Sequence, residues 1–129
     1  MDQCRGVSEQ MTNPKDLVGE KKVSLSIVPP AAILQIALAL QVGAKKYGRA
    51  NWREHKIFNM IYVDAALRHL YAYADGEDAD PETGISHLAH AAAGLSILLD
   101  AQSGGTCLET RTQTGYFGRD LRDIHEATE

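Results

Sequence analysis

The stretch RHLYAYADGEDADPETGISHLAH, residues 68 to 90, decides the fold, because two apolar segments flank a short acidic loop there. Apolar residues recur at helical spacing on both sides of this loop. Two helices that are joined by so short a connection become antiparallel neighbours. The sequence therefore predicts a helical hairpin, with five carboxylates and three histidines at or beside its loop.

Three helices are predicted in the core, and each has a recognisable start; the polar tail allows one more short helix, around Arg119 to Glu126. Pro30 suits a first helical turn, and the run that follows it is rich in alanine and leucine. Asn59 is expected to cap the second helix, whose core stripe is Met60, Val63, Leu67, Leu70 and Ala74. Ser86 is expected to cap the third helix, which is apolar nearly all round and is therefore expected to be buried. The predicted fold class is all-α.

The chain of 129 residues is expected to form one domain with three parts. Residues 1–29 are predicted to be an N-terminal extended segment, because VSLSIV alternates apolar residues with serine. Residues 30–101 form the helical core, and residues 102–129 form a polar C-terminal tail that packs on it. The small residues of the apolar helices favour close helix packing, so a homodimer or homotetramer is expected, with the substrate near a subunit boundary.

Charge and composition exclude several classes of function. The formal net charge is -4 and the basic residues are scattered, so no nucleic-acid polymer is expected as a partner. No long apolar run or signal peptide is present, so no membrane association is expected, and the predicted location is the cytoplasm, that of the host cell if a phage encodes the chain. Cys4 and Cys107 have no metal-binding spacing and are interpreted as free thiols.

The acidic loop is the first candidate for chemistry. Carboxylates this close together repel one another unless a cation offsets them, and Mg²⁺ or Mn²⁺ prefers oxygen ligands of this kind. The alternatives are a solvated turn and a structural Ca²⁺ site, since Asp, Gly, Pro and Glu are common in loops. The five carboxylates are those of Asp75, Glu77, Asp78, Asp80 and Glu82.

The second predicted helix carries a polar stripe beside its core stripe. Asp64, Arg68, Tyr71 and Asp75 follow one another at helical spacing and so lie along one side. Arg68 either forms a structural ion-pair clamp between the two aspartates or neutralises a phosphate with its fork of donors. The sequence leaves both interpretations open.

His87 and His90 share one face of the apolar third helix. A buried imidazole without a partner costs on the order of 1 to 3 kcal/mol, so both rings require partners. They are either hydrogen-bonded core histidines or groups that orient or bind an ion or substrate phosphates. The segment GAKKYGRANW offers positive charge and aromatic faces suited to phosphates and a flat base, although it also fits the basic C-terminus of a helix.

Together, GAKKYGRANW and ALRHLYAYADGEDADPETGISHLAHAA resemble the dATP/dGTP diphosphohydrolase N-terminal domain family, which is related to MazG-like all-α nucleotide pyrophosphohydrolases and is common in bacteriophages. The resemblance covers roughly residues 20 to 100, with GEKKVSLSIVPPAAI as the opening segment. It implies an oligomeric MazG-like helical bundle that uses Mg²⁺ or Mn²⁺. It also implies hydrolysis of a purine deoxynucleoside triphosphate, dGTP first and GTP or dATP as further candidates, to the monophosphate and pyrophosphate. In a phage that replaces adenine with 2-aminoadenine, this reaction supplies dGMP for the synthesis of the modified nucleotide.

The resemblance also suggests roles for individual residues. The KYxxxNW motif and the RH...GExxDxExGxxHxxH motif are matched, but no acidic residue lies in the first predicted helix, where MazG-like enzymes carry an ExxE motif. Substrate contacts are expected from Lys46, Tyr47, Asn51, Trp52, His69, His87 and His90. Metal ligands are expected from Asp64, Asp75, Glu77 and Asp80. Catalytic roles are expected for Glu77, Asp80, Glu82 and Arg68. The alternative is a non-catalytic nucleotide-binding or protein-docking helical module.

Overall fold

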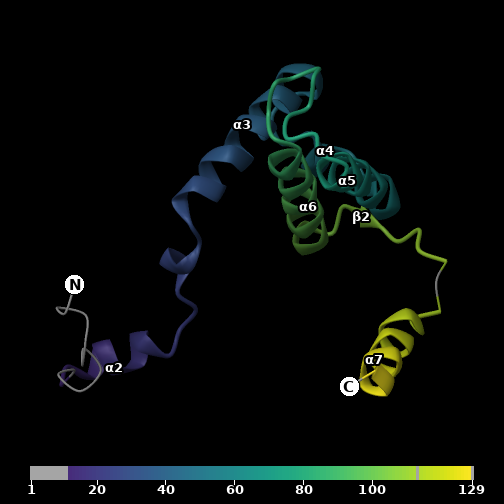
Figure 1. The fold of residues 1–129 in the computed structure, drawn as a ribbon. Coiled ribbons are helices and arrows are strands. Elements are labelled where there is room, and N and C mark those ends of the chain that lie inside the picture. Colours follow the sequence, from purple (N-terminus) through teal and green to yellow (C-terminus); the bar gives the residue numbers. More distant parts are fainter. Residues whose placement is uncertain (1–11, 113, 129) are drawn as a thin grey trace. The chain divides into compact units, whose positions relative to one another are not determined.

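The structure is a computed structural model that describes residues 12–112 and 114–128. These residues are mostly helical, and the prediction of an all-α fold is confirmed. Figure 1 shows the elements, which in chain order are α2 (Pro14–Glu20), η2 (Leu25–Ile27), α3 (Pro30–Tyr47), α4 (Asn51–Glu54), β1 (Ile57–Phe58), α5 (Asn59–Ala74), α6 (His87–Gly104), β2 (Cys107–Leu108) and α7 (Phe117–Thr128).

The chain divides into two compact units, Met1–Ile33 and Leu34–Glu129. In the first unit α2 begins after Asn13, whose side chain accepts a hydrogen bond from the backbone N–H of Lys15. The predicted extended conformation of VSLSIV is wrong, because Leu25–Ile27 forms a 3₁₀ turn. An isolated strand would leave its backbone groups unpaired, whereas the turn lets the N–H of Val28 bond the carbonyl of Leu25.

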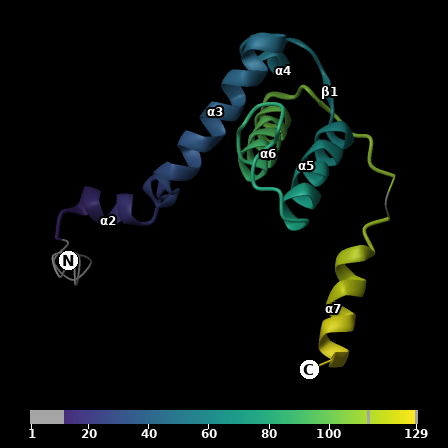
Figure 2. The same ribbon diagram turned by 45° about the horizontal axis from the view of Figure 1, so that its top comes forward.

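In the second unit, α5 and α6 pack side by side, as both ribbon views show (Figures 1 and 2). The end of α5 meets the start of α6, where His69 contacts His87. The start of α5 meets the end of α6, where Tyr62 packs on a cluster that includes Leu98 and Ala101. The two helices therefore run antiparallel, with residues 75–86 between them.

The two expected caps have different outcomes. The Ser86 side chain accepts a hydrogen bond from the backbone N–H of Leu88, so its predicted role as the N-cap of α6 is confirmed. The prediction for Asn59 is wrong, because Phe58 holds the cap position of α5. Asn59 is buried in the first turn, where its side-chain oxygen Oδ1 accepts hydrogen bonds from the backbone N–H and the hydroxyl of Thr110.

The face that α5 buries also differs from the prediction. Leu67 and Leu70 remain 39% and 40% exposed, whereas Ala66 is buried. The prediction placed the largest apolar residues inside, but α6 offers mainly alanines to its neighbours, and a small residue allows closer helix packing. On α6, Leu95 and Leu99 are exposed as well, so the expectation that this helix is buried on all sides is wrong for the single chain.

Two further contacts complete the core of this unit. Ala39 of α3 packs with Ala89 and Ala93 of α6, and Ile36, Leu40 and Ile85 lie against this cluster. β1 and β2 form a short parallel pair with Ile57 opposite Cys107. This pair was not predicted from the sequence. Residues that follow α6 are therefore held beside the start of α5.

Other expectations concern the thiols, the tail and the membrane. Cys107 is a free thiol, as predicted, and Cys4 lies outside the described residues. In the C-terminal tail α7 buries none of its residues. Within the described part of the chain, no helix is both long enough and apolar enough to cross a membrane.

Candidate functional site

Three histidines meet where the end of α5 lies against the start of α6. The Nδ1 atoms of His69 and His87 are 2.8 Å apart, which is hydrogen-bond distance. The ring of His90 stacks on that of His69, with ring centroids 4.8 Å apart and an angle of 12° between the planes. His87 is only 5% exposed. The imidazoles of α6 were predicted to need partners, and one partner of His87 is another histidine, His69.

The loop between the helices supplies the carboxylate for His87. Glu77 Oε1 lies 2.6 Å from His87 Nε2. Gly76, with φ of 104°, ends α5 with a left-handed turn that a side chain would oppose. The backbone N–H of Glu77 then bonds back to the carbonyl of Ala72, and the N–H of His87 bonds the carbonyl of Asp78. The loop therefore places Glu77 opposite His87.

His90 is held by the same loop through a different group. Its Nε2 lies 2.7 Å from Thr83 Oγ1 and 3.8 Å from Asp80 Oδ2. The other carboxylate oxygen of Asp80 accepts the backbone N–H of Glu82 at 2.9 Å. Thr83 was not predicted as a site residue. The TxxSxxxH order gives no recognised signal, and only the folded loop brings the hydroxyl to the ring.

The environment keeps His69 uncharged. Partial burial lowers the pKa of His69 below its ordinary value of 6.5, and the neighbouring His90, His87 and Arg68 lower it further. Asp80 opposes this shift because its negative charge favours the imidazolium. At neutral pH the His69 ring is therefore a neutral group with one unprotonated nitrogen.

A cavity of about 370 Å³ adjoins this cluster. Its volume suits a small organic molecule. Two histidines of the cluster line it, together with aromatic, amide and small residues from α3, α4, α5 and α6. The lining residues are Ala39, Leu40, Gly43, Ala44, Tyr47, Gly48, Asn51, Trp52, Tyr62, Ala65, Ala66, His69, His90, Ala93, Gly94 and Ile97. The two sequence motifs, which are far apart along the chain, therefore contribute to one cavity.

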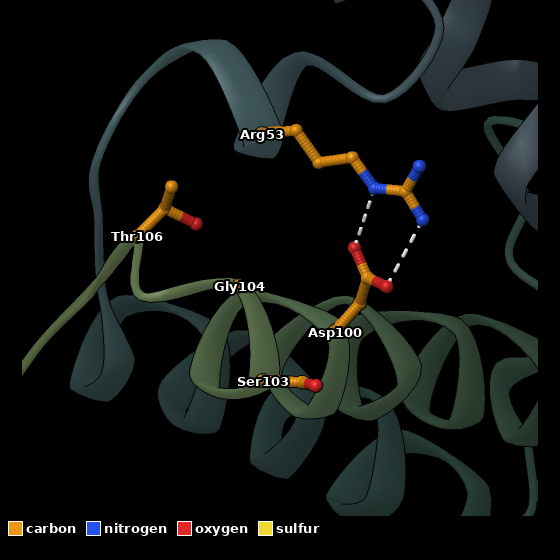
Figure 3. Close-up of a pocket in the computed structure, with 5 residues that line it drawn as sticks. All are labelled: Arg53, Asp100, Ser103, Gly104 and Thr106. Carbon is orange, nitrogen blue, oxygen red and sulfur yellow. Dashed lines mark hydrogen bonds and ion pairs between the residues drawn. The ribbon is translucent and has the colours of Figure 1, made fainter.

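The indole of Trp52 is fixed from the opposite end of α6. Asp100 Oδ2 accepts a hydrogen bond of 2.7 Å from Trp52 Nε1. Arg53 donates to both oxygens of the same carboxylate, at 2.8 Å from Nε and 3.0 Å from Nη2, as Figure 3 shows. The bonds from Arg53 and then Trp52 lower the pKa of Asp100 from 3.8 to about 2. We call these three residues the Asp100 clamp; it anchors α4 on α6.

The clamp also borders a second cavity, drawn in Figure 3. This cavity of about 320 Å³ is lined by Arg53, Asp100, Ser103, Gly104 and Thr106. The hydroxyl of Thr106 is buried without a hydrogen-bond partner in the described structure. Neither Arg53 nor Asp100 was predicted as a site residue, because a charged pair separated by so much sequence leaves no local pattern.

Lys46 and Glu82 form the remaining polar contact beside the cluster. Lys46 Nζ lies 3.4 Å from Glu82 Oε1, and both side chains are largely exposed. An exposed pair of this kind contributes little to stability, so either charge is available to a ligand.

The polar stripe of α5 makes no side-chain hydrogen bond or ion pair with the three histidines in the described residues. Asp64, Arg68 and Asp75 are exposed, and Arg68 makes no hydrogen bond or ion pair with any described residue. An ion-pair clamp of Arg68 with the two aspartates is therefore absent from this part of the chain. The guanidinium remains available to an anion.

The expected metal ligands do not form a cage in the single chain. Among the residues that the structure describes, no three His, Cys, Asp or Glu side chains are grouped so that they could hold a metal ion. Glu77 is engaged by His87, and one oxygen of Asp80 is occupied by the loop backbone. The donor set therefore does not fit a divalent ion that the chain alone encloses.

The fold and the site define an all-α protein in which an aromatic cavity adjoins a cluster of histidines and carboxylates. Comparison with known families gives a match: the model of the family described as "dATP/dGTP diphosphohydrolase, N-terminal" matches residues 12–111. The chain belongs to this family, and the resemblance noted from its motifs is confirmed.

One relative is a protein of Salmonella phage PMBT28 named dATP/dGTP diphosphohydrolase. It is 42% identical to this chain over 77 residues, which cover 60% of this chain and 26% of the relative. The chain thus spans about a quarter of the relative's length. No solved structure matches the chain.

Proposed function

We propose that this protein hydrolyses a purine deoxynucleoside triphosphate, dGTP first and dATP or GTP as alternatives, to the monophosphate and pyrophosphate. Water attacks the α-phosphorus, the bond from that phosphorus to the bridging oxygen breaks, and pyrophosphate leaves. The observation that supports the proposal is that Tyr47, Asn51 and Trp52 of the KYxxxNW motif line one cavity together with His69 and His90. The relative's name supports the reaction class.

The aromatic end of the cavity suits the base. Trp52 and Tyr47 offer flat faces for stacking, which typically contributes ~1 to 3 kcal/mol per base. The indole of Trp52 is already held in place by Asp100, so binding a ligand costs little of its conformational entropy. Asn51 lines the same cavity and has the donors and acceptor that can recognise the edge of a base.

The triphosphate is proposed to bind towards Lys46, Arg68 and the histidine cluster. Arg68 has no ion-pair partner among the described residues, and Lys46 has only an exposed one. Both are therefore free to neutralise phosphate oxygens. We propose that Mg²⁺ or Mn²⁺ arrives with the nucleotide, because Mg²⁺ is commonly bound by one or two carboxylates together with substrate phosphates. Asp64, Asp75 and Asp80 stay the candidates for these carboxylates, whereas Glu77, also expected as a ligand, is engaged by His87.

A homo-oligomer is part of the same proposal. Several large apolar side chains on α3 and α6 are exposed in the single chain, among them Leu34, Leu38, Leu95 and Leu99. Apolar surface gathered in this way is typical of a protein interface. A homodimer or homotetramer would cover these residues and would allow a partner chain to add carboxylates to the site.

The competing function is a non-catalytic nucleotide-binding module. The lack of a grouped metal-ligand set in the described residues favours it. It predicts that nucleotides bind in the same cavity without turnover, so binding alone does not distinguish the two functions.

Product analysis tests the proposal directly. The purified full chain would be incubated with each dNTP and NTP in Mg²⁺ or Mn²⁺, and monophosphate plus pyrophosphate would be resolved from diphosphate plus phosphate. We expect pyrophosphate release with purine substrates. Folded protein that binds a nucleotide but turns over none of them would favour the binding module instead.

A matched pair of tyrosine variants shows whether turnover comes from this cavity. Tyr47 lines the cavity and Tyr71 does not, yet the two side chains are 72% and 71% exposed. Tyr47→Ala should raise KM, because a stacking face is lost, whereas Tyr71→Ala should leave KM unchanged. Equal effects of the two substitutions would remove this cavity from the proposal.

A further inference from the structure

For a neutral His87 ring, the contacts of Glu77, His87 and His69 fix where the protons of the two rings lie. A carboxylate has no proton to donate, so the 2.6 Å contact requires that His87 Nε2 carries the proton and donates it to Glu77. A neutral His87 ring that donates from Nε2 has its acceptor at Nδ1. At a separation of 2.8 Å, the His69 Nδ1 must supply the proton of the bond between the rings.

The remaining nitrogen of His69 is therefore unprotonated. No described residue forms a hydrogen bond with His69 Nε2, and this atom is not among the fully enclosed polar atoms that lack a partner. His69 itself lines the cavity that also contains Trp52 and Asn51. The stacked ring of His90, which Thr83 holds, limits rotation of the His69 ring. An acceptor nitrogen is thus presented where a ligand or water can reach it.

We propose that His69 is the general base of this site and that Glu77 and His87 are positioning residues that hold it in the required tautomer. This inference rests on the proposed function. His69 Nε2 takes a proton from water while the water oxygen forms its bond to the α-phosphorus. The bond from phosphorus to the bridging oxygen breaks, and its electron pair leaves on pyrophosphate. The proton on Nε2 is then released to solvent or to the departing pyrophosphate.

The hydrogen-bond chain supports this step energetically. When His69 becomes an imidazolium, its Nδ1 proton points to His87, and His87 in turn points its Nε2 proton to the Glu77 carboxylate. A carboxylate that orients an imidazole and stabilises its charged form is the arrangement of other acid–base sites. Before the step, partial burial is the main reason that the pKa of His69 lies below its ordinary value, and Asp80 partly opposes this shift.

The first test reads the protonation directly and does not depend on activity. In the ¹⁵N NMR spectrum of the full chain with labelled histidines, His69 should carry its proton on Nδ1 and His87 on Nε2. His69→Asn assigns the resonances. A His69 ring that is protonated on Nε2 at neutral pH would overturn the inference, whatever the activity.

The second test measures turnover as a function of pH. The amide nitrogen of Asn occupies nearly the place of Nδ1, so His69→Asn retains a donor to His87 and removes only the base. General-base catalysis typically contributes ~10²- to 10⁴-fold, and a loss of kcat in this range is expected with KM little changed. Residual activity should also lose the acid limb of the wild-type pH profile. His125→Gln, on α7, is the matched histidine control and should behave as wild type.

The positioning residues have their own signature. Glu77→Gln should lower kcat less than His69→Asn and should shift the acid limb to lower pH, because the imidazolium loses its carboxylate. Wild-type turnover with a normal acid limb in His69→Asn overturns this inference alone. A wild-type chain that turns over no nucleotide overturns the proposed function and the catalytic role together, while the NMR result still reports the tautomer.

Discussion

A carboxylate accepts hydrogen bonds at each end of α6, from α4 at one end and from α6 itself at the other, but the two ends differ in which groups stay unpaired. At the C-terminal end, Asp100 is matched by Arg53 and Trp52, whose donors cannot lose their protons near neutral pH. At the N-terminal end, Glu77 is matched by His87, and the chain of bonds continues to His69. At the C-terminal end the donors and the carboxylate satisfy one another. At the N-terminal end His69 Nε2 is an acceptor with no hydrogen-bond partner among the described residues.

This difference separates a structural contact from a reactive one. A guanidinium and a carboxylate in fork geometry satisfy each other and hold two elements in one arrangement. Two imidazoles next to one carboxylate share protons that can move, so one ring nitrogen remains free to accept a proton. We expect substitutions at the Asp100 clamp to change stability and KM, and those at the histidine end to change kcat.

Among the substitutions that compare the two ends of α6, the largest effect is expected from Glu77→Ala. Without the carboxylate, the two histidines have no fixed tautomer, so kcat should fall roughly 10²-fold. The substitution also leaves Nε2 of the buried His87 without its partner, so a loss of stability of about 1 to 3 kcal/mol is expected beside the loss of kcat. The measurement is kcat together with thermal unfolding; Asp78→Ala in the same loop is the control. A loss of kcat that merely follows a loss of folded protein would remove the distinction between the two ends.

The second effect concerns ligands. Because no three groups in the described chain form a metal cage, Mg²⁺ alone should leave the melting temperature nearly unchanged. A nucleotide with Mg²⁺ should stabilise the fold, by about 2.7 kcal/mol at a free concentration of 100 times Kd. Thermal shift measurements with the ion, the nucleotide and both would show this. A large shift with Ca²⁺ alone would instead support a structural ion site in the acidic loop.

Asp100→Asn should have a smaller effect, and mainly on stability. The folded pKa of Asp100 lies at about 2, below the ordinary 3.8, so its contribution is present above pH 3.8 and is lost as the pH falls through about 2. The variant should therefore melt at a lower temperature near neutral pH and lose less stability than wild type on acidification. Its KM should rise because Trp52 is held less firmly. Asp123→Asn on α7 serves as the control, and an identical acid response of D100N and wild type would contradict the role of the clamp.

The smallest effect on stability is expected from Lys46→Ala. Its ion pair with Glu82 is exposed, and such pairs contribute only ~0 to 1 kcal/mol. If Lys46 neutralises a phosphate, KM for the triphosphate should nevertheless rise, and the rise should shrink at high salt. Lys56→Ala, outside the cavity, is the comparison. Equal KM values for the two variants would place Lys46 outside the binding site.

Local rules predicted the local features of this fold. Pro30 begins α3 and Ser86 caps α6, because both roles depend on neighbouring residues. Asn59 satisfied the same local rule for a cap, yet its side chain bonds Thr110, a residue distant in sequence. Leu67 and Leu70 were assigned to the core by size, whereas packing between α5 and α6 selects small and polar residues.

The candidate site divides in the same way. The motifs identified Trp52, Asn51, His69 and His90, which do line one cavity. They could not identify Asp100 as the partner of Trp52, because the pair forms only after α4 reaches α6. The geometry also gives Glu77 a hydrogen-bonded histidine, which residue type alone did not indicate.

The short ladder between β1 and β2 has a consequence for the order of folding. Ile57 and Cys107 are far apart along the chain, and joining them first would close a long loop at a high entropic cost. Once α5 and α6 have paired, β1 and β2 are already close, so the ladder should form late. Interactions absent from the transition state slow unfolding without speeding folding. A chain that ends at Gly105 should therefore pair its helices at nearly the same rate but unfold faster.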